Sequence, residues 1–238
     1  MAISWFDIEL VVLVYIIVFL IIAVSEYCRR RFNLGPLTTR HSIHLLAGMA
    51  LFFLPFFSEW YYPFLIPVGI GVVTATSFIF KKQSFITTSM VDEKKYSRVH
   101  AFGPLYYIIS IGVLVALAWN FRHIVIASIM IMAWGDGGAA AFAPLLKRRH
   151  RYPNSDKTVE GSIIMFILSY LGALLAYAVS IQSGILSIDM WTVALTCLVG
   201  AFAGTIVEAV TVGLIKPFDN FTVPFSSAVA MYAFSLLQ

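Results

Sequence analysis

The feature that most constrains this chain is a series of apolar runs, each close to the length of a membrane-spanning helix. A helix needs about 20 mostly apolar residues to cross the hydrocarbon core of a bilayer. Such runs follow one another along almost the whole chain, and several of the segments between them are rich in lysine and arginine. The chain is 60% hydrophobic and 12% charged, whereas a soluble domain is about half apolar and about a quarter charged.

We therefore predict an all-α integral membrane protein, a polytopic bundle of about eight transmembrane helices. The first run follows Asp7 and Glu9 and has no basic leader or small-residue cleavage site, so we interpret it as a span and not as a signal peptide. No separate soluble domain is expected within residues 1–238. The predicted spans are residues 8–25, 42–57, 61–80, 103–119, 122–141, 162–182, 190–209 and 221–237.

Lysine and arginine gather on one side of this predicted bundle. Fifteen of the 16 lie in segments on that side, and only Arg122 falls on the other. Cytoplasmic loops of membrane proteins carry an excess of these residues. We therefore expect both termini on the non-cytoplasmic side and the long basic loops in the cytoplasm. A basic face also attracts anionic lipids and anionic substrates. No nucleic-acid partner is expected, and the sequence leaves the oligomeric state open.

The stretch MAWGDGGAAAF, residues 132–142, places Asp136 among glycines at the end of an apolar run. An acidic side chain at membrane depth is costly and usually faces an interior site. Glycines such as Gly137 and Gly138 let a ligand approach the backbone closely. A carboxylate there suits a divalent cation that also holds phosphate oxygens. The alternative is a helix-packing stretch that contains a chance acid.

Two charged pairs lie on the same predicted side as Asp136. Arg40 and His44 are four residues apart, so they share one face of a helix. Lys157 and Glu160 are three apart at the start of the sixth predicted span. Lys157 is a candidate phosphate-binding group, and Glu160 would orient it or help to hold a metal ion. The alternatives are a snorkelling arginine, a hydrogen-bonded core histidine and an ordinary polar helix entrance.

Three further polar residues flank the last two predicted spans on that side. Glu208 ends the seventh span, while Asp219 and Asn220 come just before the eighth. These residues are more than helix packing needs, although Asp219 is also placed to cap a helix. In the seventh span, Gly200 and Gly204 form a small-xxx-small pair that predicts close helix packing.

The predicted topology also gathers helix N-termini on the cytoplasmic side, because spans two, four, six and eight all run outward. Helix N-termini carry unpaired N–H groups and the positive end of the helix dipole, which favours phosphate binding. The usual soluble nucleotide motifs, the P-loop and the dinucleotide fingerprint, do not occur in the sequence. A nucleotide site in this chain would therefore be built from membrane helix ends.

As a set, these pieces resemble the membrane-embedded polyprenol kinase family of dolichol, phytol and farnesol kinases, with the phytol kinase branch closest. The resemblance rests on LTTRHSIHLLAG, FGPLYY, WGDGGAA, KTVEGS and VEAV…FDNFTVP, in this order between about residues 37 and 224. It implies a single transmembrane kinase domain over residues 1–238. It also implies transfer of the γ-phosphoryl group of CTP to an isoprenoid alcohol, with Mg²⁺, at a site on the cytoplasmic membrane face.

Two departures from the family pattern bear on nucleotide preference. Arg40-His41 stands where the family has an Arg-Lys pair, and Ala143 stands where it has a glycine. The site residues remain in place. The resemblance implies catalytic roles for Asp136, Lys157, Glu208 and Asp219. The implied magnesium ligands are Asp136, Glu160 and Glu208. The implied nucleotide or phosphate contacts are Arg40, His44, Gly137, Gly138, Lys157, Glu160, Gly161, Ser162 and Asn220.

Other functions are compatible with the same residues. A CTP-dependent diacylglycerol kinase would use the same site on a different alcohol. A cytidylyltransferase would form a CDP-lipid and release pyrophosphate. A proton-coupled transporter also places acids within the membrane, but such carriers need access from both sides, and many carry repeats. Because the polar residues here gather on one face, the sequence favours an enzyme.

Overall fold

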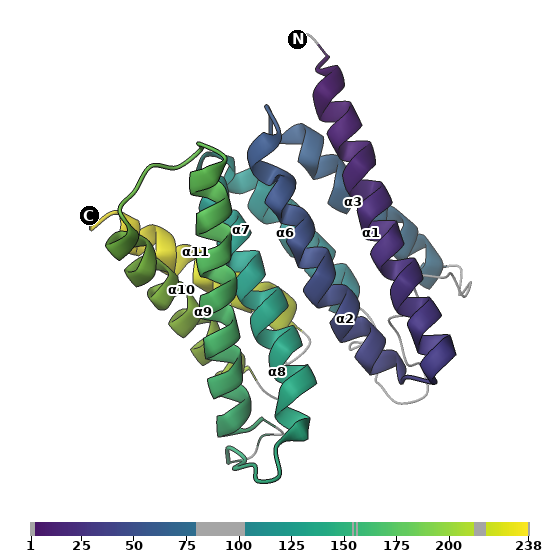
Figure 1. Cartoon of the computed structure of the whole chain (residues 1–238), viewed down its shortest axis with the longest axis vertical. Helices are drawn as coiled ribbons and strands as arrows, with labels where there is room; N and C mark the ends of the chain where they lie inside the picture. The colour runs from purple at the N-terminus through teal and green to yellow at the C-terminus, as the bar shows by residue number, and fades with distance from the viewer. Residues whose placement is uncertain (1–2, 80–102, 154, 156, 212–217, 238) are drawn as a thin grey trace. The chain divides into compact units, whose positions relative to one another are not determined.

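The computed structural model describes residues 3–79, 103–153, 155, 157–211 and 218–237, and these are helical almost throughout (Figure 1). The predicted all-α fold is confirmed. Short connecting segments join the helices, and the β-pairing found among the described residues is an isolated bridge between Arg151 and Thr158. Two of the basic segments used to predict the orientation, 81–98 and the one around Lys216, lie outside the described residues.

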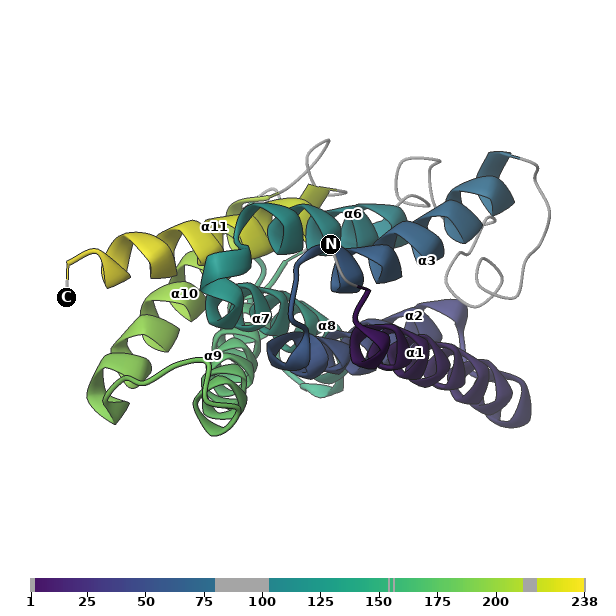
Figure 2. The ribbon, with the colours of Figure 1, turned by 90° about the horizontal axis from the view of Figure 1, so that it is seen from above.

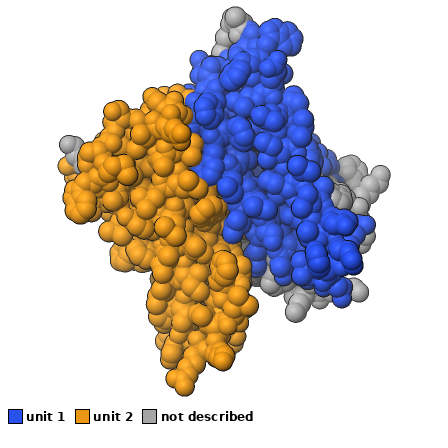
Figure 3. Space-filling model, in the orientation of Figure 1, with its two compact units in different colours: residues 1–119 blue, residues 120–238 orange. Residues whose placement is uncertain are grey.

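The chain divides into two compact units, Met1–Trp119 and Asn120–Gln238 (Figure 3). The helices of the N-terminal unit are α1 (Trp5–Phe32), α2 (Pro36–Gly48), α3 (Tyr61–Ile79) and α6 (Gly103–Leu117), with a 3₁₀ stretch Met49–Phe56 after α2. The C-terminal unit begins with one long helical segment made of α7 (Arg122–Met130), a π-helical stretch Ile131–Asp136 and α8 (Gly137–Phe142). It continues with α9 (Val159–Gln182), α10 (Met190–Val210) and α11 (Asp219–Ser235).

In the N-terminal unit, α1 packs against α2 and α3, and α3 packs against α6. Val14, Val18 and Ile22 of α1 lie four residues apart and form one buried stripe with Ile43 of α2. At the start of α1, the buried Asp7 carboxylate accepts hydrogen bonds from the backbone N–H and the hydroxyl of Ser58, at 2.8 and 2.6 Å. This acid therefore fixes the turn before α3 against the first turn of α1.

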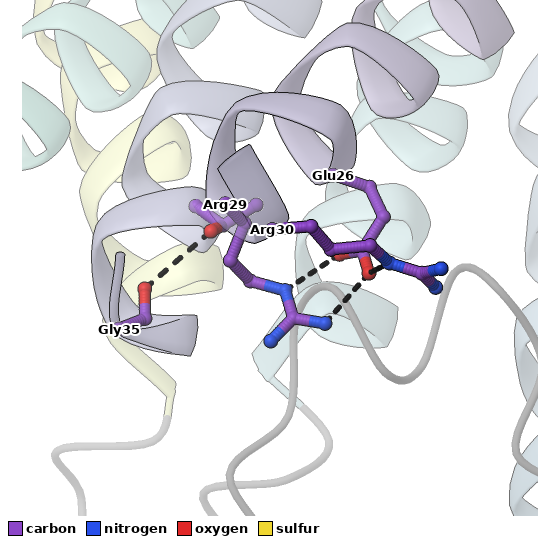
Figure 4. Close-up of polar contacts among 5 residues, drawn as sticks. Glu26, Arg29, Arg30 and Gly35 are labelled. Atoms are coloured by element: carbon purple, nitrogen blue, oxygen red, sulfur yellow. Dashed lines mark hydrogen bonds and ion pairs between the residues drawn. The ribbon is translucent and has the colours of Figure 1, made fainter. Parts of the chain in front are cut away.

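The C-terminal end of α1 carries a compact ion-pair cluster (Figure 4). Glu26 is only 1% exposed, and its carboxylate accepts two hydrogen bonds from Arg29, both at 2.6 Å, and one from Arg30 at 2.7 Å. Residues three and four apart on a helix face each other, which is why both arginines reach one acid. Part of the positive charge at this helix end is therefore neutralised within the helix.

The C-terminal unit packs around its first helical segment, which is more buried than the other three candidate membrane spans among the described residues. From Ile124 to Ala133 the side chains of this segment are almost fully enclosed. The π-helical stretch contacts α9, α10 and α11, and α10 contacts both α9 and α11 (Figures 1 and 2). A helix that is apolar all round needs such cover on every side.

Each predicted span coincides with a helical segment, although the boundaries differ. The largest difference is at the second span, which begins at Pro36 instead of residue 42 and continues as a 3₁₀ stretch from Met49. Proline is favoured at the first helical position, which accounts for the earlier start. Within the described residues, four helical segments are long and apolar enough to cross a membrane: Trp5–Phe32, Trp119–Leu145, Val159–Gln182 and Met190–Val210.

Candidate functional site

Asp136 ends the π-helical stretch at the centre of the C-terminal unit. Short π-helical segments are frequent at functional sites, because they alter which side chains share a helix face. The Ser169 hydroxyl of α9 donates a hydrogen bond of 3.0 Å to the backbone oxygen of Ile131, at the start of this stretch. The irregular backbone is thus supported from the neighbouring helix, and it positions a partly exposed carboxylate at its end.

The glycines beside Asp136 have a packing role. A methyl group on Gly135 would lie 3.2 Å from the backbone oxygen of Met165 and would overlap the Ser169 hydroxyl. A methyl group on Gly138 would overlap Leu168. Both glycines therefore let α9 approach the central segment closely. The predicted phosphate contacts of Gly137 and Gly138 remain predictions.

The small-xxx-small pair in α10 brings three helices together, as predicted. A methyl group on Gly204 would lie 2.5 Å from Ser227 Oγ and 2.8 Å from Ile131 Cγ2. On Gly200 it would lie 2.6 Å from Met231 Cγ. Neither glycine can gain a side chain unless its neighbours move, so both are needed for the contact of α10 with α11 and the π-helical stretch.

This packing fixes which polar residues share one end of the C-terminal unit. At a rise of 1.5 Å per residue, Glu208 lies about 6 Å beyond Gly204 along α10. Asp136 lies five residues beyond Ile131, at the end of the π-helical stretch. On α11, which runs the opposite way, Asn220 comes a little less than one turn before Val223, and Val223 faces Gly204. All three polar residues therefore lie toward the same end of the bundle.

Lys157 and Glu208 form an ion pair between the start of α9 and the end of α10. Lys157 Nζ lies 2.6 Å from Glu208 Oε1 and also donates a hydrogen bond to the backbone oxygen of Glu208. The two side chains are only 11% and 14% exposed. A cation at a helix C-terminus is also favoured by the helix dipole. Two residues 51 positions apart in the sequence, both predicted as site residues, are thus brought into contact.

A short loop before α9 presents Lys157. Its ends are joined by a hydrogen bond of 3.0 Å from the Tyr152 N–H to the Lys157 oxygen and by the bridge between Arg151 and Thr158. Thr158 then caps α9, and its hydroxyl accepts a hydrogen bond from the Gly161 N–H at 3.1 Å. This cap explains why the chain turns into a helix directly after Lys157.

Glu160 secures the same loop. Its carboxylate lies 2.5 Å from His150 Nδ1 and accepts a hydrogen bond of 2.8 Å from the His150 backbone N–H. In this structure Glu160 and the N–H of Gly161 are thus engaged locally, and an anion at the N-terminus of α9 would compete with these contacts. Their predicted roles toward phosphate and metal remain predictions. The Ser162 hydroxyl is buried and finds no hydrogen-bond partner among the described residues.

Asp219 and Asn220 begin α11. The Asp219 carboxylate accepts a hydrogen bond of 2.7 Å from the Asn220 N–H, and Asn220 is buried. Asp219 is the first residue of α11 and does not cap it; the capping position is Phe218, whose side chain makes no capping hydrogen bond. The alternative interpretation of Asp219 as the helix cap is therefore not supported.

Arg40 and His44 belong to the N-terminal unit and line an apolar cavity there. The His44 ring stacks on Tyr107 of α6, with the ring centres 4.0 Å apart. His44 Nε2 is buried and finds no hydrogen-bond partner among the described residues. A methyl group on Gly103, the first residue of α6, would overlap the Arg40 guanidinium. The predicted site residues are thus divided between the two units.

Within the described part of the chain, no three His, Cys, Asp or Glu side chains gather as a ready-made metal site. Glu208 and Glu160 are paired with Lys157 and His150. The donor types nevertheless suit Mg²⁺, which proteins usually hold through one or two carboxylates together with substrate phosphates. Asp136, with one further acid, would satisfy that requirement.

Sequence reasoning missed three residues that shape these regions. Tyr107 lies within the FGPLYY piece, but nothing in its spacing indicates the contact with His44. Ser169 looks like any small residue of an apolar helix, so its hydrogen bond to Ile131 had no signal. The contact of Glu26 did have a sequence signal, since Glu26 precedes Arg29 and Arg30 at helical spacing.

Comparison with known proteins finds relatives that are named phytol kinases. The chain is 37% identical over 136 residues to probable phytol kinase 1, chloroplastic, of Oryza sativa subsp. japonica. This alignment covers 55% of the chain and 41% of the relative. It is 33% identical over 146 residues to the phytol kinase of Synechocystis sp., covering 58% of this chain and 57% of that protein. The chain spans about half the length of the curated relatives it matches. No protein-family profile and no solved structure matches it.

Proposed function

We propose that this chain, a member of the phytol kinase family, is a membrane-embedded lipid kinase. It transfers the γ-phosphoryl group of a nucleoside triphosphate to the hydroxyl of an isoprenoid alcohol of the phytol, geranylgeraniol, farnesol or polyprenol type. The observation that carries the proposal is 33–37% identity, over more than half of the chain, to proteins named phytol kinase. The resemblance of its motifs to the polyprenol kinases supports CTP as the donor.

Lys157 is the group that binds the triphosphate. Phosphoryl transfer depends mostly on positioning and on neutralising charge, and a lysine at the phosphates is a recurring part of such sites. Without nucleotide, Glu208 neutralises the ammonium group of Lys157 at 2.6 Å. Phosphate oxygens compete with Glu208 for this ammonium group, and a freed Glu208 carboxylate is then available as a second magnesium ligand. Glu160 serves the same purpose if His150 releases it.

Asp136 is the principal ligand for Mg²⁺. When bound, the ion neutralises charge on the phosphates, which proteins that transfer phosphoryl groups generally require. Asp219 is the candidate base that accepts the proton of the alcohol, and Asn220 is buried beside it. These roles match the position of the residues at one end of the C-terminal unit.

The site faces the cytoplasm in this proposal, and the chain crosses the membrane about eight times with both termini on the other side. The bias of Lys and Arg toward one side supports this orientation. Large apolar side chains such as Ile16, Leu20 and Val24 are more than half exposed on α1, as expected of a lipid-facing helix. An interfacial site lets the bilayer accept part of the alcohol's hydrocarbon chain.

Product analysis tests the proposal. Purified protein in detergent is given Mg²⁺ and γ-labelled CTP or ATP, with phytol, geranylgeraniol, farnesol, a long polyprenol or diacylglycerol as acceptor. We expect labelled isoprenyl monophosphate and the nucleoside diphosphate, with CTP the better donor. Labelled phosphatidic acid as the main product would identify a diacylglycerol kinase. CDP-lipid with release of pyrophosphate would identify a cytidylyltransferase. Either result would overturn the proposal, as would a folded protein that phosphorylates none of these alcohols.

A further inference from the structure

The N-terminal unit contains a cavity that the proposed chemistry of the C-terminal unit does not use. It lies between α1, α2, α3 and α6, has a volume of about 100 Å³ and opens to the outside. The lining is almost wholly aliphatic, with the buried stripe Val14, Val18 and Ile22 on one side.

Resting on the proposed function, we infer that this cavity holds part of the hydrocarbon chain of the acceptor alcohol, with the oxygen end of the alcohol at Arg40 and His44. This assigns to the two residues a role in binding the alcohol. The sequence pattern had placed them among the nucleotide contacts.

The first argument is the distribution of polarity in the lining. Arg40 and His44 are one helical turn apart on α2, and among the described residues that line the cavity they alone have a charged or imidazole side chain. Tyr107 also lines the cavity, and its hydroxyl donates to the backbone oxygen of His44. A cavity that is apolar except for one polar pair fits a molecule with one polar end. Diacylglycerol, with two ester-linked chains, would bury more oxygen atoms than this lining can serve.

The second argument is the unsatisfied nitrogen of His44. Most buried polar side-chain atoms in proteins have a hydrogen-bond partner, so each exception needs a reason. His44 Nε2 has no such partner among the described residues, although Tyr107 holds the ring by stacking at 4.0 Å between ring centres. The hydroxyl of a bound alcohol supplies that partner.

A binding experiment without nucleotide tests the location of the hydrocarbon chain. Ala47 lines the cavity, whereas its neighbour Leu46 is exposed and does not. We expect Ala47→Phe to fill part of the cavity and weaken the binding of radiolabelled phytol by about tenfold, while Leu46→Phe binds like wild type. Equal affinities for the two variants, both folded, would overturn the assignment.

A second experiment tests recognition of the hydroxyl. His44→Phe keeps a ring that can stack on Tyr107 and removes both nitrogens. In competition with labelled phytol, wild-type protein should prefer unlabelled phytol over its hydrocarbon analogue phytane by about tenfold, which is the value of one hydrogen bond. The variant should show almost no preference. A preference that survives in His44→Phe would exclude His44 as the hydroxyl contact, and diacylglycerol competing as well as phytol would overturn the inference.

Photolabelling needs no variant. A phytol analogue with a diazirine on its chain should label peptides from α1, α2, α3 or α6 of wild-type protein, and excess phytol should suppress the label. Label confined to the C-terminal unit would contradict the inference. The proposed function fails separately: a protein that binds phytol in this pattern and forms no lipid phosphate keeps the cavity assignment and loses the kinase assignment. If the protein phosphorylates phytol but Ala47→Phe leaves phytol binding unchanged, the kinase assignment stands and the cavity assignment is overturned.

Discussion

The two units of this chain differ in how completely their interiors are filled. In the C-terminal unit, glycines at positions 135, 138, 200 and 204 let helices approach a central segment whose side chains are almost fully enclosed. In the N-terminal unit, four helices surround an apolar cavity of about 100 Å³ that opens to the outside. Interiors are normally packed to crystal-like density, so the cavity is a departure from ordinary packing.

The difference matches the two proposed tasks, phosphoryl transfer and hydrocarbon binding. A phosphoryl-transfer site needs charges held in fixed positions, and the dense C-terminal unit holds the Lys157–Glu208 pair at 2.6 Å. A hydrocarbon chain needs apolar space with few directional contacts, which the N-terminal unit provides. The proposed phosphoryl-transfer site thus lies in the densely packed unit, and the proposed hydrocarbon site lies in the unit with a cavity. Substitutions in the two units should therefore fail in different ways.

The largest effect should come from removing the charge of Asp136. We expect Asp136→Asn to lower phosphate transfer about a thousandfold, because the metal-held charge neutralisation at the phosphates is lost. Steady-state rates with CTP and phytol measure this. The control is Glu59→Gln, which changes an exposed acid in the N-terminal unit and should retain wild-type rates. Comparable losses of phosphate transfer in both variants would contradict the proposed role of Asp136 as the magnesium ligand.

The next effect concerns the Lys157–Glu208 pair, which could be structural only. We expect Lys157→Ala to lower transfer about a hundredfold, and to lower stability by about 2 kcal/mol because Glu208 is left largely buried without its partner. Exchanging the two residues, Lys157→Glu with Glu208→Lys, should restore stability but not transfer. If the exchanged protein regains its activity, the pair serves the fold and not the phosphate.

Glycine substitutions compare the close contact at Gly204 of α10 with a looser position in the N-terminal unit. Gly204→Ala should destabilise the protein by about 1–3 kcal/mol, because the new methyl group meets Ile131 and Ser227 in a closed interior. In α3 of the N-terminal unit, a methyl group on Gly71 lies 3.4 Å from Ile108, an ordinary contact. Gly71→Ala should therefore stay within about 1 kcal/mol of wild type. Unfolding by denaturant titration in micelles measures both, and equal changes would refute the difference in packing.

The smallest effect tests the support of the π-helical stretch. Ser169→Ala removes the hydrogen bond to Ile131 and should lower stability by about 1 kcal/mol. The matched control is Ser180→Ala on the same helix, whose hydroxyl bonds only to the oxygen of Ala176 in its own helix. That loss should be no more than about half a kcal/mol, because such local bonds stabilise helices little. An equal loss at both sites would mean that the stretch needs no support from α9.

The helices were predictable from the sequence because a long apolar run is an unambiguous signal. The close packing at Gly200 and Gly204 was predictable from their spacing for a similar reason. The division of the site residues between two units was not predictable, because the order of motifs along the chain does not tell which helices pack together. The cavity around His44 depends on gaps among side chains from four helices, and no local pattern encodes a gap.

The contact of Lys157 with Glu208 is a second feature that the sequence could not predict. Both residues were predicted to belong to a phosphate site, yet their sequence separation of 51 positions left no sign that they pair in the absence of nucleotide. Likewise, Glu160 was predicted to orient Lys157 or bind metal, and in the structure it holds His150. Charge type and helix position are readable from sequence, whereas partners across a bundle are not.

The most direct test of this account is a pair of Michaelis constants measured in two variants. The account predicts that Lys157→Ala raises the KM for CTP and leaves the KM for phytol near the wild-type value. It predicts that Ala47→Phe raises the KM for phytol about tenfold and leaves the KM for CTP unchanged. If the two variants change the same constant, or if Ala47→Phe affects neither, the proposed separation of nucleotide and hydrocarbon binding between the two units is contradicted.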